Sequence, residues 1–444
     1  MRRLAIAGAL LALACEPSAA APDPGSGDAA APDELTLQLR SLVLSPDAAP
    51  PPDPTNAFAD DPAAARLGQA WFFDRRFAGP LLAHDNTGGS GTLGHQGEVG
   101  RVSCADCHVP EHGFVDTRST RGQLSLASGW TRRRTQSLLD VAQAQLLTWG
   151  GRRDTGYSIV FGVIESPLEL NSSRLFVAQE IARSYREEYE AVFGPLPALD
   201  AYEELAPEEA GCDVLPEDPR AVCERPGFDD PEVTRVVVNF GKAIDAYVRQ
   251  LSCGPGRFDA WVSGDDDALS AEEQAGARLF AGRAGCIDCH SGPYFSDQQF
   301  HNVGVPGSLS PFTGVDTAGD RGAAIDLAAA REDWLSSRGV FSDGDDGRLD
   351  RAPAGTALEG AFRTPMLRCA GRRPSYFHNG EYRSLHDVVQ HFIDGGSGAR
   401  GHVGTSELAP LDLSSEEREQ LVAFLRALDG PGPRDELLVP PPEE

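Results

Sequence analysis

The chain has 444 residues, enough for about two to three domains of the usual size. Its formal charge at pH 7 is −28, from 67 acidic and 39 basic residues. A surface of this sign repels nucleic acids and anionic membranes, so we expect no nucleic-acid partner. It favours solubility, and it can steer a basic protein partner electrostatically.

The first 14 residues predict an export signal. Arg2 and Arg3 precede an apolar run that ends at Ala14 and is too short to cross a membrane. Cys15 follows this run as in a bacterial lipoprotein cleavage site, although an ordinary signal peptide can carry a cysteine there by coincidence. No later run is long enough for a membrane span. We expect a periplasmic or exported protein with a lipid anchor at Cys15 and no transmembrane helix.

Residues 15–55 are rich in Ala, Pro and Asp and lack sustained periodicity, so a flexible tether is predicted. A helix is expected next, because Leu67, Trp71 and Phe72 recur at helical intervals. A glycine-rich loop over 86–100 then leads to the first cysteine motif.

The motif S-C-A-D-C-H-V-P contains Cys104 and Cys107 with two residues between them, and His108 directly follows the second cysteine. In c-type haem attachment each thiol forms a thioether with a haem vinyl group, and the adjacent histidine binds the iron. A structural zinc site needs two further ligands, and a redox dithiol needs a βαβ setting that the flanking sequence does not show. The histidine favours haem, but a single copy leaves all three interpretations open.

Further helices are predicted at 137–148, 174–193 and 231–251, the last with an apolar face. Two long polar stretches, 196–230 and 303–357, are expected to be surface insertions.

Apart from Cys15 and the cysteines of the C-x-x-C-H motifs at 104–108 and 286–290, four cysteines remain. Cys212 and Cys223 are close together in an acidic loop, so we expect a local disulfide in an oxidising compartment. Cys253 and Cys369 could form a second disulfide or remain free and buried, because sequence does not fix connectivity.

The motif recurs as C-I-D-C-H, with Cys286, Cys289 and His290. The second histidine follows the first by 182 residues (290 minus 108), too far for one zinc knuckle. A zinc ion shared by the four cysteines would leave both histidines without a role. Two c-type haems, with His108 and His290 as axial iron ligands, are the better interpretation.

Capping boxes at Ser270/Glu273 and Ser414/Glu417 predict two helices in the second half, and strand signals are scarce. We therefore predict a mostly α fold of two tandem cytochrome c-like haem domains with long loop insertions. The expected segments are a signal peptide (1–14), the tether (15–55), an N-terminal haem domain (56–262), a C-terminal haem domain (263–432) and a tail (433–444).

Several segments occur in a characteristic order. They are L-G-Q-A-W-F-F-D, W-G-G-R and E-S-P-L-E-L-N, followed by C-I-D-C-H-S-G-P-Y-F-S-D, F-R-T-P-M-L-R and Y-F-H-N-G. Over about residues 56–430 the chain therefore resembles the bacterial dihaem cytochrome c peroxidases and their MauG-like relatives. The resemblance implies a peroxidatic N-terminal haem and an electron-transfer C-terminal haem.

The resemblance also implies roles for two residues. Trp149 falls where relatives have a tryptophan between the haems, where a ring can relay electrons; the alternative is a core aromatic at an interface. Glu169 falls at the catalytic acid–base, and the alternative is a surface glutamate in a turn. Heterolytic cleavage of peroxide requires a proton to move between its oxygens, which one carboxylate can accomplish. The flanking Leu168 and Leu170 favour a raised pKa.

Three positions depart from the family pattern. Ile159 replaces a glutamine of the peroxide pocket, and Arg134 replaces an asparagine that helps to bind calcium, so we do not expect calcium. Phe392 stands where relatives have a methionine or tyrosine ligand of the second haem, and phenylalanine cannot bind iron. The distal ligand of the second haem is therefore unassigned, and the candidates for it are His391, His301, His378 and Met366.

The expected activity is reduction of hydrogen peroxide to water. Electrons would come from a small donor such as a cytochrome c or a cupredoxin, enter at the C-terminal haem and pass through Trp149. A MauG-like oxidase of another protein or substrate and a non-enzymatic dihaem electron carrier are the alternatives. Residues 113–289 contain no histidine or methionine, and His112 is close to His108. We therefore expect the first haem to have an open distal face in the oxidised protein.

Overall fold

The computed structural model describes residues 33–442, apart from 119–123, 219, 311–312 and 397–399. Helices dominate this part of the chain, and the predicted mostly α class is confirmed. Strand β1 (Phe300–His301) pairs antiparallel with β2 (Phe362–Arg363). None of the helices in the described ranges is long and apolar enough to cross a membrane. The α-helices are α1 (Glu34–Ser41), α2 (Pro62–Phe73), α3 (Cys104–Cys107), α4 (Gly156–Glu165), α5 (Arg174–Ser184), α6 (Arg186–Phe193), α7 (Pro231–Val248), α8 (Arg257–Val262), α9 (Ala271–Ala281), α10 (Ala323–Glu332), α11 (Arg348–Arg351), α12 (Leu385–Ile393) and α13 (Ser415–Ala427).

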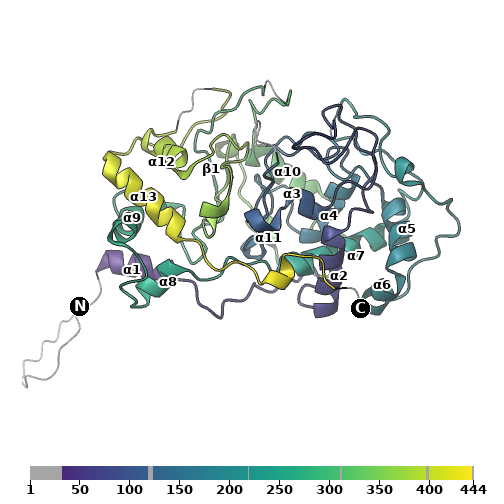
Figure 1. The fold of residues 1–444 in the computed structure, drawn as a ribbon, viewed down its shortest axis with the longest axis horizontal. Helices are drawn as coiled ribbons and strands as arrows, with labels where there is room; N and C mark the ends of the chain where they lie inside the picture. The colour runs from purple at the N-terminus through teal and green to yellow at the C-terminus, as the bar shows by residue number, and fades with distance from the viewer. Residues whose placement is uncertain (1–32, 119–123, 219, 311–312, 397–399, 443–444) are drawn as a thin grey trace, which may run out of the picture.

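The helix pair α2 and α7 forms the centre of one end of the molecule (Figure 1). The two helices approach closely at Gly68, where a Cβ atom would lie 1.9 Å from the carbonyl oxygen of Ala243. Next to this crossing, Trp71 stacks on Phe240 with ring centroids 4.8 Å apart. These residues belong to a large hydrophobic core in the first half of the chain.

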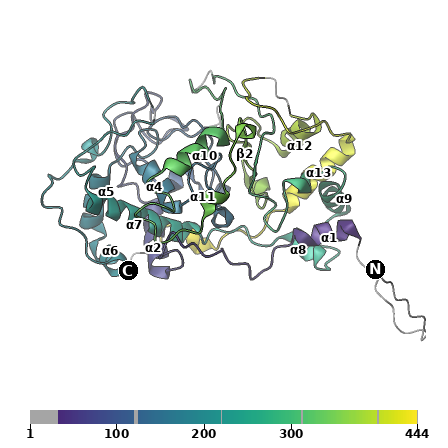
Figure 2. The ribbon, with the colours of Figure 1, turned by 180° about the vertical axis from the view of Figure 1, so that it is seen from behind.

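The pair α9 and α13 repeats this arrangement at the other end (Figure 2). A Cβ atom at Gly276 would lie 1.9 Å from the carbonyl oxygen of Gln420, and the rings of Phe280 and Phe424 are 5.2 Å apart. Both helices begin at the capping boxes expected from the sequence. Each cysteine motif thus has its own helix crossing and its own hydrophobic core.

The two ends of the described chain pack on opposite halves of the molecule. Helix α1 lies against α9, and Leu39 and Leu42 are buried in the core of the C-terminal half. The segment after α13 returns to the N-terminal half, where Gln69 on α2 donates hydrogen bonds to the Glu436 and Val439 carbonyls at 2.6 and 2.8 Å. The prediction of a flexible tether is therefore wrong for residues 33–44, because these leucines recover enough apolar contact to order the segment. The predicted signal peptide and Cys15 lie outside the described residues.

Two helix predictions also need correction. Residues 137–148 form only a short 3₁₀ turn at Val141–Gln143, because Asp140 has a left-handed backbone and binds the chain after α7 instead. Its carboxylate accepts a hydrogen bond from the backbone N–H of Cys253 at 3.1 Å. The helix predicted for 174–193 is divided at Tyr185, whose hydroxyl donates to Asp74 at 2.8 Å. In both cases a tertiary contact overrides local propensity.

The stretch 303–357 is more than a surface insertion. It contains α10 and α11, and part of it packs on the N-terminal half: Trp334 contacts Phe161 edge to face at 5.5 Å. The expected local disulfide joins Cys212 to Cys223, within the other stretch. The second expected pairing, of Cys253 with Cys369, is also present.

Candidate active site

Helix α3 carries both cysteines of the first motif on a single turn, and His108 follows directly. Ser103 begins the turn by donating from its backbone N–H and its hydroxyl to the Asp106 carboxylate, at 2.8 and 2.7 Å. Arg75 holds the same carboxylate at 2.9 Å. The turn therefore fixes two thiols and one imidazole close together without any metal.

The two motif histidines make the same hydrogen bond. His108 Nδ1 lies 3.1 Å from the Phe114 carbonyl oxygen, and His290 Nδ1 lies 2.8 Å from the Phe295 carbonyl oxygen. A ring nitrogen that faces a carbonyl must carry the proton, so Nε2 of each ring is the nitrogen that can bind iron. Burial lowers the pKa of both histidines, which further favours the neutral, metal-binding form.

The geometry does not support a shared zinc ion or a redox disulfide. All four motif cysteines are free thiols. Within the described part of the chain, the one cluster of metal-binding type joins Cys289 to Asp297 and His301, and no such cluster combines cysteines from both motifs. Each motif therefore serves a separate group.

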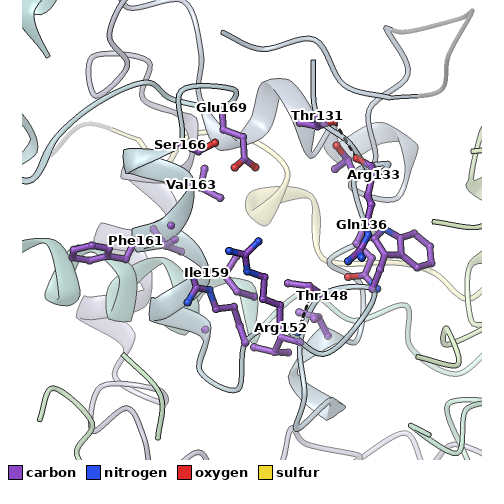
Figure 3. Close-up of a pocket in the computed structure, with 18 of the residues that line it drawn as sticks. Thr131, Arg133, Gln136, Thr148, Arg152, Ile159, Phe161, Val163, Ser166 and Glu169 are labelled. Carbon is purple, nitrogen blue, oxygen red and sulfur yellow. Dashed lines mark hydrogen bonds between the residues drawn. The ribbon is translucent and has the colours of Figure 1, made fainter. Parts of the chain in front are cut away.

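A cavity of about 1000 Å³ lies against the first motif. His108, its two cysteines and Phe72 form one wall, while Ile159 and Val163 of α4 line another wall near Glu169 (Figure 3). Among the described residues that line the cavity, His108 is the one histidine, and methionine and tyrosine are absent. His112 is exposed and is not part of the wall. The volume is in the range of cofactor sites.

Glu169 lies in this cavity, in the turn that follows α4 (Figure 3). A hydrogen bond from a distant segment stabilises this turn, because the backbone N–H of Ser128 donates to the Glu169 carbonyl at 3.2 Å. Burial raises the pKa of Glu169, while a hydrogen bond with Ser166 and the charges of Arg152 and Arg153 oppose part of this rise. A carboxyl group so poised can exchange protons closer to neutral pH than an ordinary glutamate can.

Arginines line the cavity beside Glu169, and the second half of the chain supplies their partners. Arg153 pairs with Asp333, and Arg133 pairs with Asp320 at 2.7 Å. Both aspartates belong to the stretch 303–357, which therefore forms part of the cavity wall. Arg152 makes no ion pair with a carboxylate of the described residues, although it lines the same cavity (Figure 3).

Trp149 lies where the two halves meet. Its indole N–H donates to the Arg134 carbonyl at 2.8 Å, and its own carbonyl accepts from the Arg363 N–H at 2.8 Å. The Arg134 N–H in turn donates to the His378 carbonyl at 2.7 Å. Trp149 is buried and also lines the cavity of the first motif. The ring is therefore fixed between segments that follow the two cysteine motifs.

The candidates for the second distal ligand lie in different environments. His391 has both ring nitrogens engaged, with Tyr382 Oη at 3.0 Å and the Val303 carbonyl at 2.7 Å. His301 contacts Asp297 and another carboxylate, and Asp297 is the main cause of a pKa raised to about 11. Neither imidazole can bind iron without losing these contacts.

The remaining two candidates are buried. His378 stacks on Phe362 at 3.7 Å, and burial lowers its pKa to about 3. Met366 packs against Leu147 in a small apolar cluster with Ile159.

Two separate cysteine motifs, each followed by a histidine with a fixed tautomer, define a c-type protein with two haem sites. Comparisons with known proteins agree. Residues 62–267 match the family model described as di-haem cytochrome c peroxidase. The chain is thus similar to di-haem cytochrome c peroxidases and MauG proteins, which are oxidoreductases, and its cofactors are two c-type haems.

Individual relatives cover most of the chain. Methylamine utilization protein MauG of Methylorubrum extorquens is 29% identical over 95% of this chain and 91% of its own length. Cytochrome-c peroxidase IdrP1 of Denitromonas iodatirespirans is 29% identical over 85% of each chain. The solved structure of the diheme peroxidase BthA from Burkholderia thailandensis has a TM-score of 0.60 at 21% identity, covering 88% of this chain and 89% of that chain. This last similarity supports the fold.

The structure brings Glu169, Trp149, Ile159 and the first haem motif to one cavity, while the second motif lies in the other half. Sequence reasoning assigned no role to Arg152, although it belongs to the quoted segment W-G-G-R. It also missed the contribution of the stretch 303–357 to the cavity wall. No local pattern shows that contribution, because it depends on contacts between residues more than 150 positions apart, such as Arg153 and Asp333.

Proposed function

We propose that the chain is a dihaem peroxidase that reduces hydrogen peroxide to water, consuming two electrons and two protons per peroxide. One observation carries the proposal: the cavity beside His108 contains a partly buried carboxyl group, Glu169, whose pKa is raised. A simple electron carrier has no need of a proton donor and acceptor beside its haem, and it normally has two protein ligands on each iron. We therefore favour an enzyme over a carrier.

A bound c-type haem supplies a redox-active iron that can coordinate peroxide. Glu169 would accept the proton of the near peroxide oxygen and return it to the departing oxygen, so that water can leave. Arg152 and Arg153 would keep a useful fraction of Glu169 ionised, because their charges oppose the effect of burial. The apolar Ile159 and Val163 would limit competing hydrogen bonds in the same cavity.

Electrons would enter at the C-terminal haem and pass through Trp149 to the N-terminal haem. The hydrogen bonds that hold Trp149 between the halves support this route. The two helix crossings and their separate cores support two tandem cytochrome c-like domains over 56–262 and 263–432.

A periplasmic or exported location, with a lipid anchor at Cys15, remains our proposal. The two disulfides support it, since such bonds persist in oxidising compartments. The electron donor would be a small cytochrome c or a cupredoxin, and the charge of −28 favours a donor with a basic surface.

A MauG-like oxidase is the second candidate. MauG of Methylorubrum extorquens is similar over 95% of this chain, and Phe392 lacks any group that can bind iron. Stopped-flow addition of peroxide to the dihaem protein, with and without a reduced donor protein, separates the two. A peroxidase oxidises two donor molecules per peroxide, whereas an oxidase of other substrates turns over slowly with a cytochrome or cupredoxin.

The role of Glu169 is tested with Glu169→Gln, which keeps the side-chain volume but removes the proton acceptor. We expect peroxide turnover to fall by about 10²-fold or more, within the range of general acid–base catalysis. Haem content and the ferric spectrum should be unchanged. Glu188→Gln, at an exposed position of α6, is the matched control and should retain the parent rate. A Glu169→Gln variant with the parent rate would refute the assigned role.

A further inference from the structure

Three arginines lie close together where the two halves of the molecule meet. Arg134 and Arg363 are 4% and 5% exposed, and Arg373 is partly buried. They surround the Trp149 contact: the Arg134 carbonyl accepts from the indole, and the Arg363 N–H donates to the Trp149 carbonyl. Arg373 is near enough for its charge to lower the pKa of the other two arginines.

These three guanidinium groups have too few partners. Nε and Nη2 of Arg134 and Nε of Arg363 and Arg373 are buried with no hydrogen-bond acceptor. The acceptors that do contact the group are neutral: the Gln298 side chain for Arg363 at 2.9 Å and the Met366 carbonyl for Arg373 at 2.8 Å. No carboxylate of the described residues forms an ion pair with any of the three.

The other buried arginines of the described residues differ in having a carboxylate partner. Each of the remaining buried arginines pairs with a carboxylate: Arg174 with Glu165, Arg249 with Asp60, Arg348 with Asp53 and Arg368 with Asp259. Asp140 and Asp429 favour the charge of Arg373, but only from beyond ion-pair distance. Among the buried arginines of the described residues, the carboxylate partner is therefore missing for Arg134 and Arg363, and the neighbouring, partly buried Arg373 also lacks one.

Buried guanidinium groups without a carboxylate partner require an anion to balance their charge. Guanidinium groups remain charged in proteins, and a buried charge without a partner costs several kcal/mol. Burial is the main reason that the pKa of Arg134 falls to about 9 and that of Arg363 to about 10. Arginine binds carboxylates through two parallel hydrogen bonds, so unpaired Nε and Nη2 atoms together suit a carboxylate oxygen pair.

We propose that Arg134, Arg363 and Arg373 form a carboxylate-binding site for haem propionates, and that this site raises the reduction potential of the haem it contacts. Position supports this occupant, because Arg134 and Trp149 line the cavity of the first motif and Arg363 donates to Gln298, which follows His290 of the second motif by eight residues. Positive charge near an iron centre stabilises the reduced state, which carries one positive charge fewer. The proposal rests on the two haems and does not depend on peroxide reduction.

Potentiometric titration of the dihaem protein tests the proposal. Replacing Arg134 or Arg363 by methionine should lower the midpoint potential of at least one haem. The expected loss is about tenfold or more in the equilibrium constant for reduction, or 59 mV for a one-electron couple. Resonance Raman bands of propionate bending should shift in the same variants. The matched control is Arg225→Met, because Arg225 also has a buried, unpaired Nε but contacts Asp213 near the first disulfide.

The source of the carboxylate is tested by titrating the parent protein with inorganic phosphate and with acetate. With propionates as occupants, the potentials should not depend on either anion. Potentials that shift with anion concentration in the parent but not in the variants would assign a free anion and overturn the propionate site. Should the methionine variants fail to mature, Arg134→Lys and Arg363→Lys keep the charge and should still shift the Raman bands. Unchanged potentials and unchanged bands in all folded variants would refute the proposal.

Discussion

The cavity that surrounds Glu169 affects the pKa of its carboxyl group in two opposite ways. Loss of hydration raises its pKa, and Arg152 and Arg153 lower it. The net shift is upward, so the carboxyl group is more readily protonated than an exposed glutamate. Arg153 is already paired with Asp333, which leaves Arg152 as the charge that a single substitution can remove most cleanly.

This balance predicts the pH dependence of peroxide reduction. Glu169 must be ionised to accept a proton, so kcat/KM should fall as the pH decreases through its pKa, above the range of an ordinary glutamate. Arg152→Gln removes a charge that lowers this pKa, so the acid limb should move to higher pH. Arg40→Gln, at an exposed site on α1, should leave the profile unchanged. An acid limb that stays in place in Arg152→Gln would contradict the assigned electrostatics.

A second prediction at this scale concerns the resting state of the N-terminal haem. The described residues of the cavity wall offer no second histidine and no methionine, and His112 is exposed elsewhere. We expect a high-spin ferric signal in the fully oxidised protein, and reaction with peroxide without prior reduction. Electron paramagnetic resonance and stopped-flow absorbance measure both. A purely low-spin resting spectrum, with no reaction until one electron is added, would contradict this expectation.

At the scale of the helices, two glycines permit the helix crossings that support the haem motifs. Gly68 lies in the α2–α7 contact and Gly276 in the α9–α13 contact, and each faces a carbonyl oxygen of the partner helix. Four residues further along each helix, Phe72 and Phe280 approach the rings of His108 and His290 at 6.5 and 6.3 Å. The same spacing in both halves places a phenylalanine of the helix crossing beside the motif histidine, which we propose as the haem ligand.

We therefore expect Gly68→Ala to destabilise the protein. The new methyl group would lie 1.9 Å from the Ala243 carbonyl oxygen, so the helices must separate. Overpacking of this kind costs about 1–3 kcal/mol or more, and denaturant unfolding followed by tryptophan fluorescence would measure it. Gly89→Ala is a suitable control, because the nearest atom to its Cβ would be Thr87 Oγ1 at 3.4 Å. Equal stability of the two variants would show that the crossing tolerates a wider separation.

At the scale of the whole molecule, the halves are linked by several segments that cross between them. Helix α1 packs on the C-terminal half, and the segment beyond α13 packs on the N-terminal half, where Tyr247 donates to the Leu437 carbonyl at 2.5 Å. The disulfide between Cys253 and Cys369 joins the end of the first half to the second. These links join the two halves of the molecule at several separate points.

The two disulfides should contribute unequally to stability. The Cys253–Cys369 bond closes a span of 116 residues, whereas the Cys212–Cys223 bond closes a span of 11. In the chain-entropy model, removing the longer one should cost about 5 kcal/mol and the shorter one about 3 kcal/mol. Paired Cys→Ala variants, compared by the free energy of unfolding in denaturant, would check the order. The reverse order would indicate that native contacts, and not chain entropy, dominate.

The amino-acid sequence by itself predicted the two c-type haems, because thioether attachment and an axial ligand depend on residues within five positions of one another. It also predicted α2, α7, α9 and α13, since their apolar periodicity and end residues are local signals. Only the tertiary structure decided that 137–148 is not a helix, that α1 is part of a core and that 303–357 forms part of the cavity wall. The sequence likewise did not predict that Arg134 and Arg363 would be buried without a carboxylate partner. Burial and missing counter-charges arise from contacts between distant segments, and such contacts leave no local pattern to read.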